Sequence, residues 1–134
     1  MEAIYASSSA VDTDWTATLY TLAPTGELRV IGLTFGILRA RYREGMDRPM
    51  LLAPDSIYAF RIDMGHTAVT LNEGEQLRLD IASAAFTEFS RNLNTGGNNE
   101  TESEYMTARQ RIHHGAIHPS HLLLPTTQPA EDDR

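Results

Sequence analysis

Apolar and polar residues alternate with a period of two along much of the chain, and this constrains the fold more than any other feature. Trp15, Ala17 and Leu19, for example, alternate with Thr16 and Thr18. Because successive side chains of a β-strand point to opposite faces of the sheet, this alternation predicts strands with one buried face. The predicted strands are residues 15–22, 28–33, 37–43, 58–64, 67–71, 77–83 and 122–124.

Turn-forming residues separate these strands. Pro24-Thr25-Gly26 and Asn72-Glu73-Gly74 each lie between two of them. Several short strands at close spacing are typical of an all-β sandwich or barrel, which we expect over residues 1–125. Phe86 and Phe89 have roughly helical spacing and predict a helical turn within 82–93. Residues 126–134 are predicted to form a flexible acidic tail.

Composition excludes several classes of protein. The net charge is −7, so we expect no binding to nucleic acid, which requires clustered positive charge. The 134 residues include no cysteine, which excludes disulfides, thiolate nucleophiles and cysteine-based zinc sites. We find neither a signal peptide nor an apolar run of the ~20 residues that a membrane helix needs. We therefore expect a soluble, cytoplasmic chain, although a larger parent protein could be secreted.

Catalytic machinery of the serine-hydrolase type is not apparent in the sequence. A nucleophile elbow would read Gly-x-Ser-x-Gly between a strand and a helix, and the chain contains no such pentapeptide. Serine, histidine and aspartate all occur, but no local context activates any serine as a nucleophile. We therefore predict that the chain has no catalysis of its own.

Asp12 and Asp14 directly precede Trp15 and are candidates for a polar site. Two carboxylates at this spacing could bind calcium or cap a turn. They could also pair with Arg39, Arg41 and Arg43, which would share one face of a strand over 37–43. Carboxylates drawn out of water need partners, so ion pairing of Asp12 and Asp14 with Arg39 and Arg41 is the favoured interpretation.

Histidines cluster near the C-terminus. His113, His118 and His121 are weak candidates for metal ligands. In an extended segment, however, His113 and His114 would point to opposite faces, and Pro119 would break a helix that could gather the others. We therefore expect neither a metal nor another cofactor.

An Asn-, Gly- and Thr-rich segment over 92–104 is predicted to be a long exposed loop. Together with exposed aromatic residues, it could bind a sugar in a free-standing sandwich module. The candidate binding residues for this alternative are Asn94, Asn98, Asn99 and Tyr105.

Several motifs, in order along the chain, resemble a known family. They are Ser7-Ser8-Ser9-Ala10-Val11-Asp12-Thr13-Asp14-Trp15, Pro24-Thr25-Gly26, Leu38-Arg39-Ala40-Arg41-Tyr42-Arg43, Gly74-Glu75-Gln76-Leu77-Arg78-Leu79-Asp80-Ile81, Phe89-Ser90-Arg91-Asn92-Leu93-Asn94-Thr95-Gly96 and Pro119-Ser120-His121-Leu122-Leu123-Leu124-Pro125. From about Tyr5 to Pro125, the chain resembles the C-terminal domain of the X-prolyl dipeptidyl-peptidase and cocaine-esterase family of serine hydrolases. Glu75 departs from that pattern, since the family often has histidine there.

This resemblance implies a jelly-roll sandwich with a galactose-binding-like topology. It places the Ser-His-Asp triad on a separate α/β-hydrolase domain, upstream in the family, and no catalytic residue of the family maps onto this chain. The expected function is that of an accessory domain that packs against this catalytic domain, in cis or in trans. The family's domain usually has further strand sequence before Ser7, so the sandwich is expected to lack one or more N-terminal strands. An incomplete sandwich predicts self-association or pairing with a partner strand.

Overall fold

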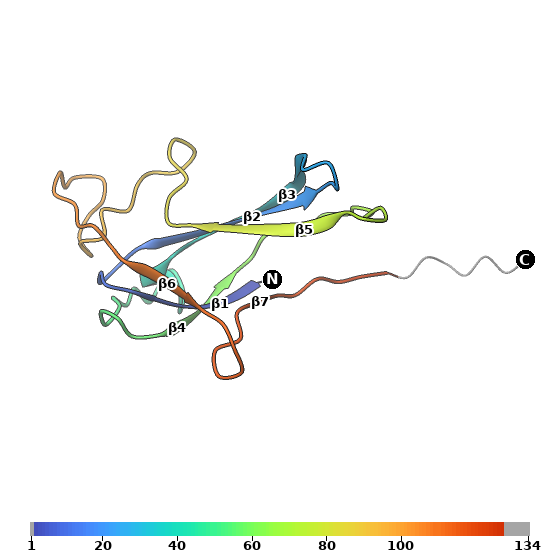
Figure 1. Ribbon diagram of the computed structural model, residues 1–134. Helices are drawn as coiled ribbons and strands as arrows, with labels where there is room; N and C mark the ends of the chain where they lie inside the picture. Colours follow the sequence, from blue (N-terminus) through green and yellow to red (C-terminus); the bar gives the residue numbers. More distant parts are fainter. Residues whose placement is uncertain (1, 128–134) are drawn as a thin grey trace, which may run out of the picture.

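The computed structural model describes residues 2–127. The strands of this part of the chain form two antiparallel β-sheets (Figure 1). In the first sheet, β1 (Glu2–Ser8) is central and pairs with β4 (Tyr58–Ile62). The short strands β6 (Gln110–His113) and β7 (His121–Leu122) pair with opposite ends of β1. The strand β1 thus gathers segments from the middle and the end of the chain.

The second sheet has the order β3-β2-β5. Its strands are β2 (Asp14–Leu22), β3 (Leu28–Arg39) and β5 (Gln76–Ala82). The register between β2 and β3 shifts between Thr18 and Tyr20, where β3 contains extra residues. Thr34 lies in this bulge, and its hydroxyl donates to the backbone oxygens of Ile31 and Leu19. This hydroxyl thereby binds a buried backbone oxygen at a point where the ladder is interrupted.

The core lies between the two sheets. The apolar side chains with almost no exposed surface include Ile4, Ala6, Trp15, Ala17, Leu19, Phe60 and Ile62. The rings of Trp15 and Phe60, from opposite sheets, have centroids 5.7 Å apart. Each fully buried large apolar side chain contributes about 1.5–3 kcal/mol to stability. The alternation in β2 and β4 therefore has the role that the sequence predicted, with one face of each strand in the core.

The sheets approach each other closely at Gly36. A Cβ atom at this position would lie 2.5 Å from Cγ2 of Ile62 and 2.6 Å from the backbone oxygen of Asp63. A residue without a side chain is therefore needed where β3 passes the end of β4.

The structure corrects the prediction of separate strands over 28–33 and 37–43. The strand β3 continues through the bulge and ends at Arg39, after which Ala40–Tyr42 forms a 3-10 helix. The backbone amide of Ala40 donates to the oxygen of Thr13 at 2.8 Å, and this bond lies outside the β2–β3 ladder. Arg39, Arg41 and Arg43 consequently do not share one strand face.

Two other predictions for local structure need revision, and two strands are additional. Residues 67–71 form no strand; Val69 and Leu71 are 48% and 43% exposed, so no buried face holds this segment in a ladder. The helical turn in 82–93 is limited to one bond, from the amide of Phe89 to the oxygen of Ala85. The strands β1 and β6 were not predicted from the sequence.

Within residues 2–127, no helix is long and apolar enough to cross a membrane. Most of the predicted acidic tail, residues 128–134, lies outside the described residues.

Candidate functional site

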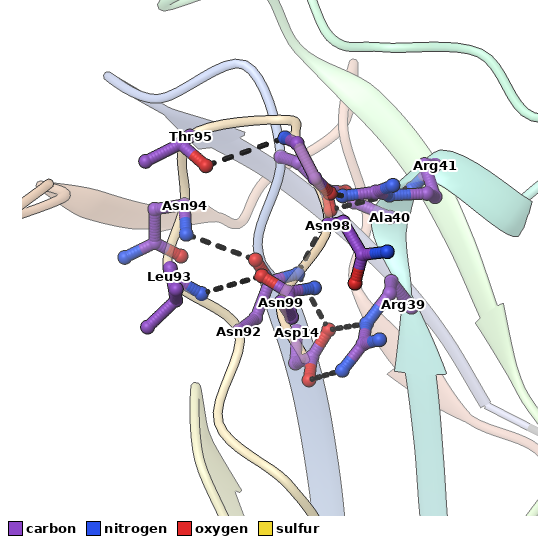
Figure 2. A network of polar contacts seen from close by, with 12 residues as sticks. Asp14, Arg39, Ala40, Arg41, Asn92, Leu93, Asn94, Thr95, Asn98 and Asn99 are labelled. Carbon is purple, nitrogen blue, oxygen red and sulfur yellow. Dashed lines mark hydrogen bonds and ion pairs between the residues drawn. The ribbon is translucent and has the colours of Figure 1, made fainter. Parts of the chain in front are cut away.

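Two aspartates are buried at the start of β2. Asp12 is 0% exposed and Asp14 2% exposed, and Thr13 between them is also buried. Ionised carboxylates are strongly disfavoured in such a position unless donors surround them. Figure 2 shows the polar groups that surround Asp14 at this point.

Arg39, the last residue of β3, binds Asp14. Its Nε and Nη2 atoms donate to Oδ1 and Oδ2 of Asp14 at 2.9 and 3.1 Å. This geometry follows from the sheet register, because Asp14 and Arg39 lie directly opposite each other on β2 and β3. A side-on pair of this kind is among the stronger charge-assisted hydrogen bonds in proteins.

Arg41 binds Asp12 from the 3-10 helix that follows β3. Its backbone amide donates to Oδ1 at 2.9 Å, and its Nε donates to Oδ2 at 2.8 Å. Its Nη2 continues to the backbone oxygen of Gly97 at 2.7 Å. Arg41 thus joins the start of β2 to the loop that contains Gly97.

Asn92 lies between the two aspartates. Its Nδ2 donates to Oδ2 of Asp12 at 2.9 Å and to Oδ1 of Asp14 at 2.8 Å. Its Oδ1 accepts a bond from the amide of Asn94 at 2.9 Å. Asn92 was not among the predicted partners, because nothing local connects it to carboxylates about 80 positions earlier. The Asn-rich character of 92–104 was the one signal that could have indicated it.

The whole arrangement, Asp12, Asp14, Arg39, Arg41 and Asn92, is referred to below as the Asp–Arg network. It brings together the four residues that the sequence analysis proposed as ion-pair partners. Two carboxylates face two guanidinium groups, so the formal charges balance. The hydrogen bonds to Asp14 raise the pKa of Arg39 above its ordinary value, against the opposing effect of burial.

The network contains no group with an obvious catalytic or ligand-binding role. The carboxylate oxygens of Asp12 and Asp14 accept bonds from arginine and asparagine side chains, and neither carboxylate faces a serine or histidine. What the arrangement can do is fix the end of β3 and the loop at 92–97 against the start of β2. Its role is therefore positional.

The loop over 92–104 is irregular, as predicted, but its amides are engaged within it. Asn99 accepts from the amide of Leu93 at 2.9 Å, and Asn98 accepts from the amide of Glu100 at 2.9 Å. Asn94 donates to the backbone oxygen of Met106 at 2.9 Å. Tyr105 is 75% exposed and lies apart from these bonds. This internal use of three of the four candidate residues lends no support to a sugar site in the loop.

The histidines do not converge on one point. The His113 and His118 rings have centroids 6.0 Å apart, and His113 Nε2 lies 3.0 Å from the hydroxyl of Ser7. His121 instead contacts the backbone oxygen of Pro119 through Nδ1 at 2.7 Å. Among residues 2–127, no three histidine, aspartate or glutamate side chains are grouped so that they could hold a metal ion.

Comparison with known protein families identifies the family of this domain. A family described as the X-Pro dipeptidyl-peptidase C-terminal non-catalytic domain matches residues 3–123, most of the chain. The chain belongs to this family. The resemblance inferred from the motifs is thereby confirmed, and so is the expectation of a non-catalytic C-terminal domain.

Two relatives show how the domain relates to larger proteins. Cocaine esterase from Rhodococcus sp. (strain MB1 Bresler) is 44% identical over 124 residues, which cover 91% of this chain and 21% of the esterase. The crystal structure of an aminopeptidase from a marine sediment Thaumarchaeota archaeon superposes with a TM-score of 0.82 at 26% identity. That match covers 89% of this chain and 21% of the aminopeptidase chain. This member of the non-catalytic domain family thus spans about a fifth of the length of each relative.

Proposed function

We propose that this chain packs against an α/β-hydrolase catalytic domain, in the same polypeptide or in a separate one. Its contribution would be interface area and the positioning of loops, and the chemistry would reside on the partner. The observation that carries the proposal is the family match over residues 3–123, because that family is described as non-catalytic. The two relatives, in which this domain is about a fifth of the chain, support it further.

An apolar pocket between the two sheets also supports a contact with a further segment or domain. Apolar side chains of Ile4, Leu79, Ile81, Ile112 and Leu122 line a pocket of about 440 Å³. Figure 1 shows β5 and β7 in opposite sheets. Leu79 and Ile81 belong to β5 and Leu122 to β7, so the pocket lies between strands of opposite sheets. Apolar surface that the chain itself leaves partly uncovered is typical of a contact with another segment.

We also propose a specific topology for the two sheets. A jelly roll with a galactose-binding-like arrangement would place further strands beside those of this chain, and an added strand or the hydrolase domain would then cover the apolar pocket. If neither is present, two copies of the chain would cover it by self-association.

The proposed parent enzyme transfers acyl groups through a serine on its catalytic domain, with esters or X-Pro amides as substrates. The names of the family and of the two relatives, an esterase and an aminopeptidase, support this substrate range.

Two measurements on the purified chain test the proposal. Incubation with a nitrophenyl ester and with an X-Pro nitroanilide should give no turnover. Turnover that a serine-directed inhibitor abolishes would contradict a non-catalytic role. Light scattering over a wide concentration range should show association of the isolated chain, and a stable monomer would count against uncovered apolar surface as the cause of pairing.

Co-purification with the hydrolase domain of the same protein, expressed separately, tests the contact itself. Ile81→Gln should weaken the contact, because Ile81 lines the pocket between the sheets. Leu28→Gln is the matched control, since Leu28 is an apolar strand residue that is 42% exposed and does not line that pocket. Equal retention of both variants would place the contact elsewhere on the domain.

A further inference from the structure

A second polar feature lies on the first sheet, apart from the Asp–Arg network. Ile4 and Ala6 of β1 point into the core, so Tyr5 and Ser7 belong to the opposite face. On the neighbouring strand β6, Arg111 lies opposite Ser7, and His113 lies opposite Tyr5. Ser7, Arg111 and His113 therefore share this outer face.

These residues line a pocket of about 270 Å³. Its lining consists of Ser7, Asp55, Ile57, Arg109, Arg111 and His113. Hydrogen bonds fix its walls. The amide of Asp55 donates to the backbone oxygen of Ser8 at 2.7 Å, the amide of Ser9 donates to the backbone oxygen of Arg109 at 3.0 Å, and the amide of Arg109 donates to the hydroxyl of Ser9 at 2.8 Å. The volume is too small for an oligosaccharide and suits a small polar group with some water.

The lining of the pocket holds a local excess of positive charge. Arg29, Arg39, Arg41 and Arg78 each form an ion pair with a carboxylate. Within the described part of the chain, Arg109 and Arg111 form none, and neither do Arg43, Arg48, Arg61 and Arg91. With Asp55 as the acidic residue in the lining, two positive charges and one negative leave a formal excess of +1. This excess occurs in a protein whose net charge is −7.

The hydroxyl of Ser7 adds a directed donor. Ser7 is 6% exposed, and its Oγ lies 3.0 Å from Nε2 of His113. When Nε2 carries the proton it donates to Oγ, and the serine proton is then free to point at another acceptor. Guanidinium and hydroxyl groups are the groups that recognise oxyanions, and Arg109, Arg111 and Ser7 line the same small pocket.

We propose that this pocket binds a single oxyanion of the carboxylate or phosphate class. The guanidinium groups of Arg109 and Arg111 supply the charge, and Ser7, held by His113, supplies a hydrogen bond. Asp55 opposes the ligand electrostatically and limits its affinity. The site is independent of the proposed contact with a hydrolase domain, because none of its residues lines the pocket between the sheets.

Titration of the ¹⁵N-labelled chain with inorganic phosphate, and separately with acetate, tests this assignment. Saturable shifts are expected at the backbone amides of 7–9, 55–57 and 109–113. Arg111→Gln should weaken binding about tenfold, since it removes a charge-assisted contact from an exposed side chain. Asp55→Asn should strengthen binding by removing the opposing charge. Arg48→Gln, at another exposed arginine that does not line the pocket, should leave binding unchanged.

Saturation by both anions indicates a general oxyanion site, and saturation by one of them identifies the class. Shifts that do not saturate, or that Arg111→Gln and Arg48→Gln reduce equally, would show nonspecific association and overturn the proposal. Thermal unfolding of each variant distinguishes lost binding from lost folding. If Arg111→Gln fails to fold, the opposite effect expected of Asp55→Asn still decides the matter.

Discussion

The guanidinium of Arg39 binds the carboxylate of Asp14 through two parallel hydrogen bonds of 2.9 and 3.1 Å. The side chain of Asp14 is only 3% exposed, and that of Arg39 is 25% exposed. The pair thus lies at the margin of the core, where a partner left alone would be poorly solvated.

Replacement of Asp14 by asparagine should therefore be strongly destabilising. The amide keeps the shape of the carboxylate but leaves Arg39 without its counter-charge, which should cost about 3 kcal/mol of unfolding free energy. Urea denaturation measures this change. Asp80→Asn is the matched control, because Asp80 pairs with Arg78 on the surface, where the two side chains are 41% and 49% exposed. That control should have no measurable effect, and equal losses in the two variants would contradict the importance of burial.

Replacement of Arg39 by lysine should change how stability depends on pH. The pKa of Arg39 is raised, chiefly by its hydrogen bonds to Asp14, so its contribution is fully present below the pKa of an unfolded arginine. That contribution is lost only as the pH rises through the still higher pKa of the folded state. An unperturbed lysine titrates at about pH 10.4.

The lysine variant should accordingly lose stability relative to the parent chain between about pH 9 and about pH 12. At neutral pH it should already be about 1 kcal/mol less stable, because a lysine cannot form the two-pronged contact. Denaturation curves of both proteins across this range provide the comparison. Parallel curves would exclude titration at position 39 as a determinant of stability.

The stability of the chain should depend more on the hydrogen bonds of the Asn92 amide than on the size of this side chain. Asn92→Asp would place a third carboxylate against Asp12 and Asp14, so it should destabilise the chain more than Asn92→Ala does. Faster hydrogen exchange in residues 93–106 would report release of the loop. Asn98→Asp is the control, because Asn98 is exposed and a carboxylate can still accept the bond from the amide of Glu100. Similar exchange in the two aspartate variants would mean that Asn92 does not hold the loop.

Two glycines of β3 should respond oppositely to alanine. Gly36→Ala would place a methyl group 2.5 Å from Ile62, and overpacking of this kind costs about 1–3 kcal/mol. A Cβ at Gly32 would meet nothing within 4 Å, so Gly32→Ala should be neutral or slightly stabilising. Thermal unfolding distinguishes the two, and a neutral Gly36→Ala would show that the sheets can separate at this point at little cost.

The sequence predicted the strands in which large side chains alternate, and it was weak where the residues are small. The strands β2, β4 and β5 carry Trp15, Phe60 and Leu79, whose alternation with polar neighbours is evident. The strand β1 has the sequence Glu-Ala-Ile-Tyr-Ala-Ser-Ser, in which Ile4 is the one large aliphatic residue. Its place in the centre of a sheet is decided by pairing with distant strands, which a local pattern does not contain.

The candidate site shows the same limit. The pairing of Asp12 and Asp14 with arginines could be expected from charge alone, because buried carboxylates need donors. The observed geometry differs from the predicted one, since Arg41 contacts Asp12 from a 3-10 helix and not from a strand face. The bridging role of Asn92 was not predictable, because it depends on where the loop returns in space.

The pairing of β1 also has a consequence for the order in which the chain acquires structure. The backbone amide of Tyr5 donates to the hydroxyl of Ser120, 115 positions later, and β6 and β7 complete the same sheet. One edge of β1 can pair with β4 earlier, but almost the entire domain must be synthesised before the other edge can pair with β6 and β7. Until then, one edge of β1 is unpaired, so folding should be slow and nascent chains should depend on chaperones to avoid aggregation.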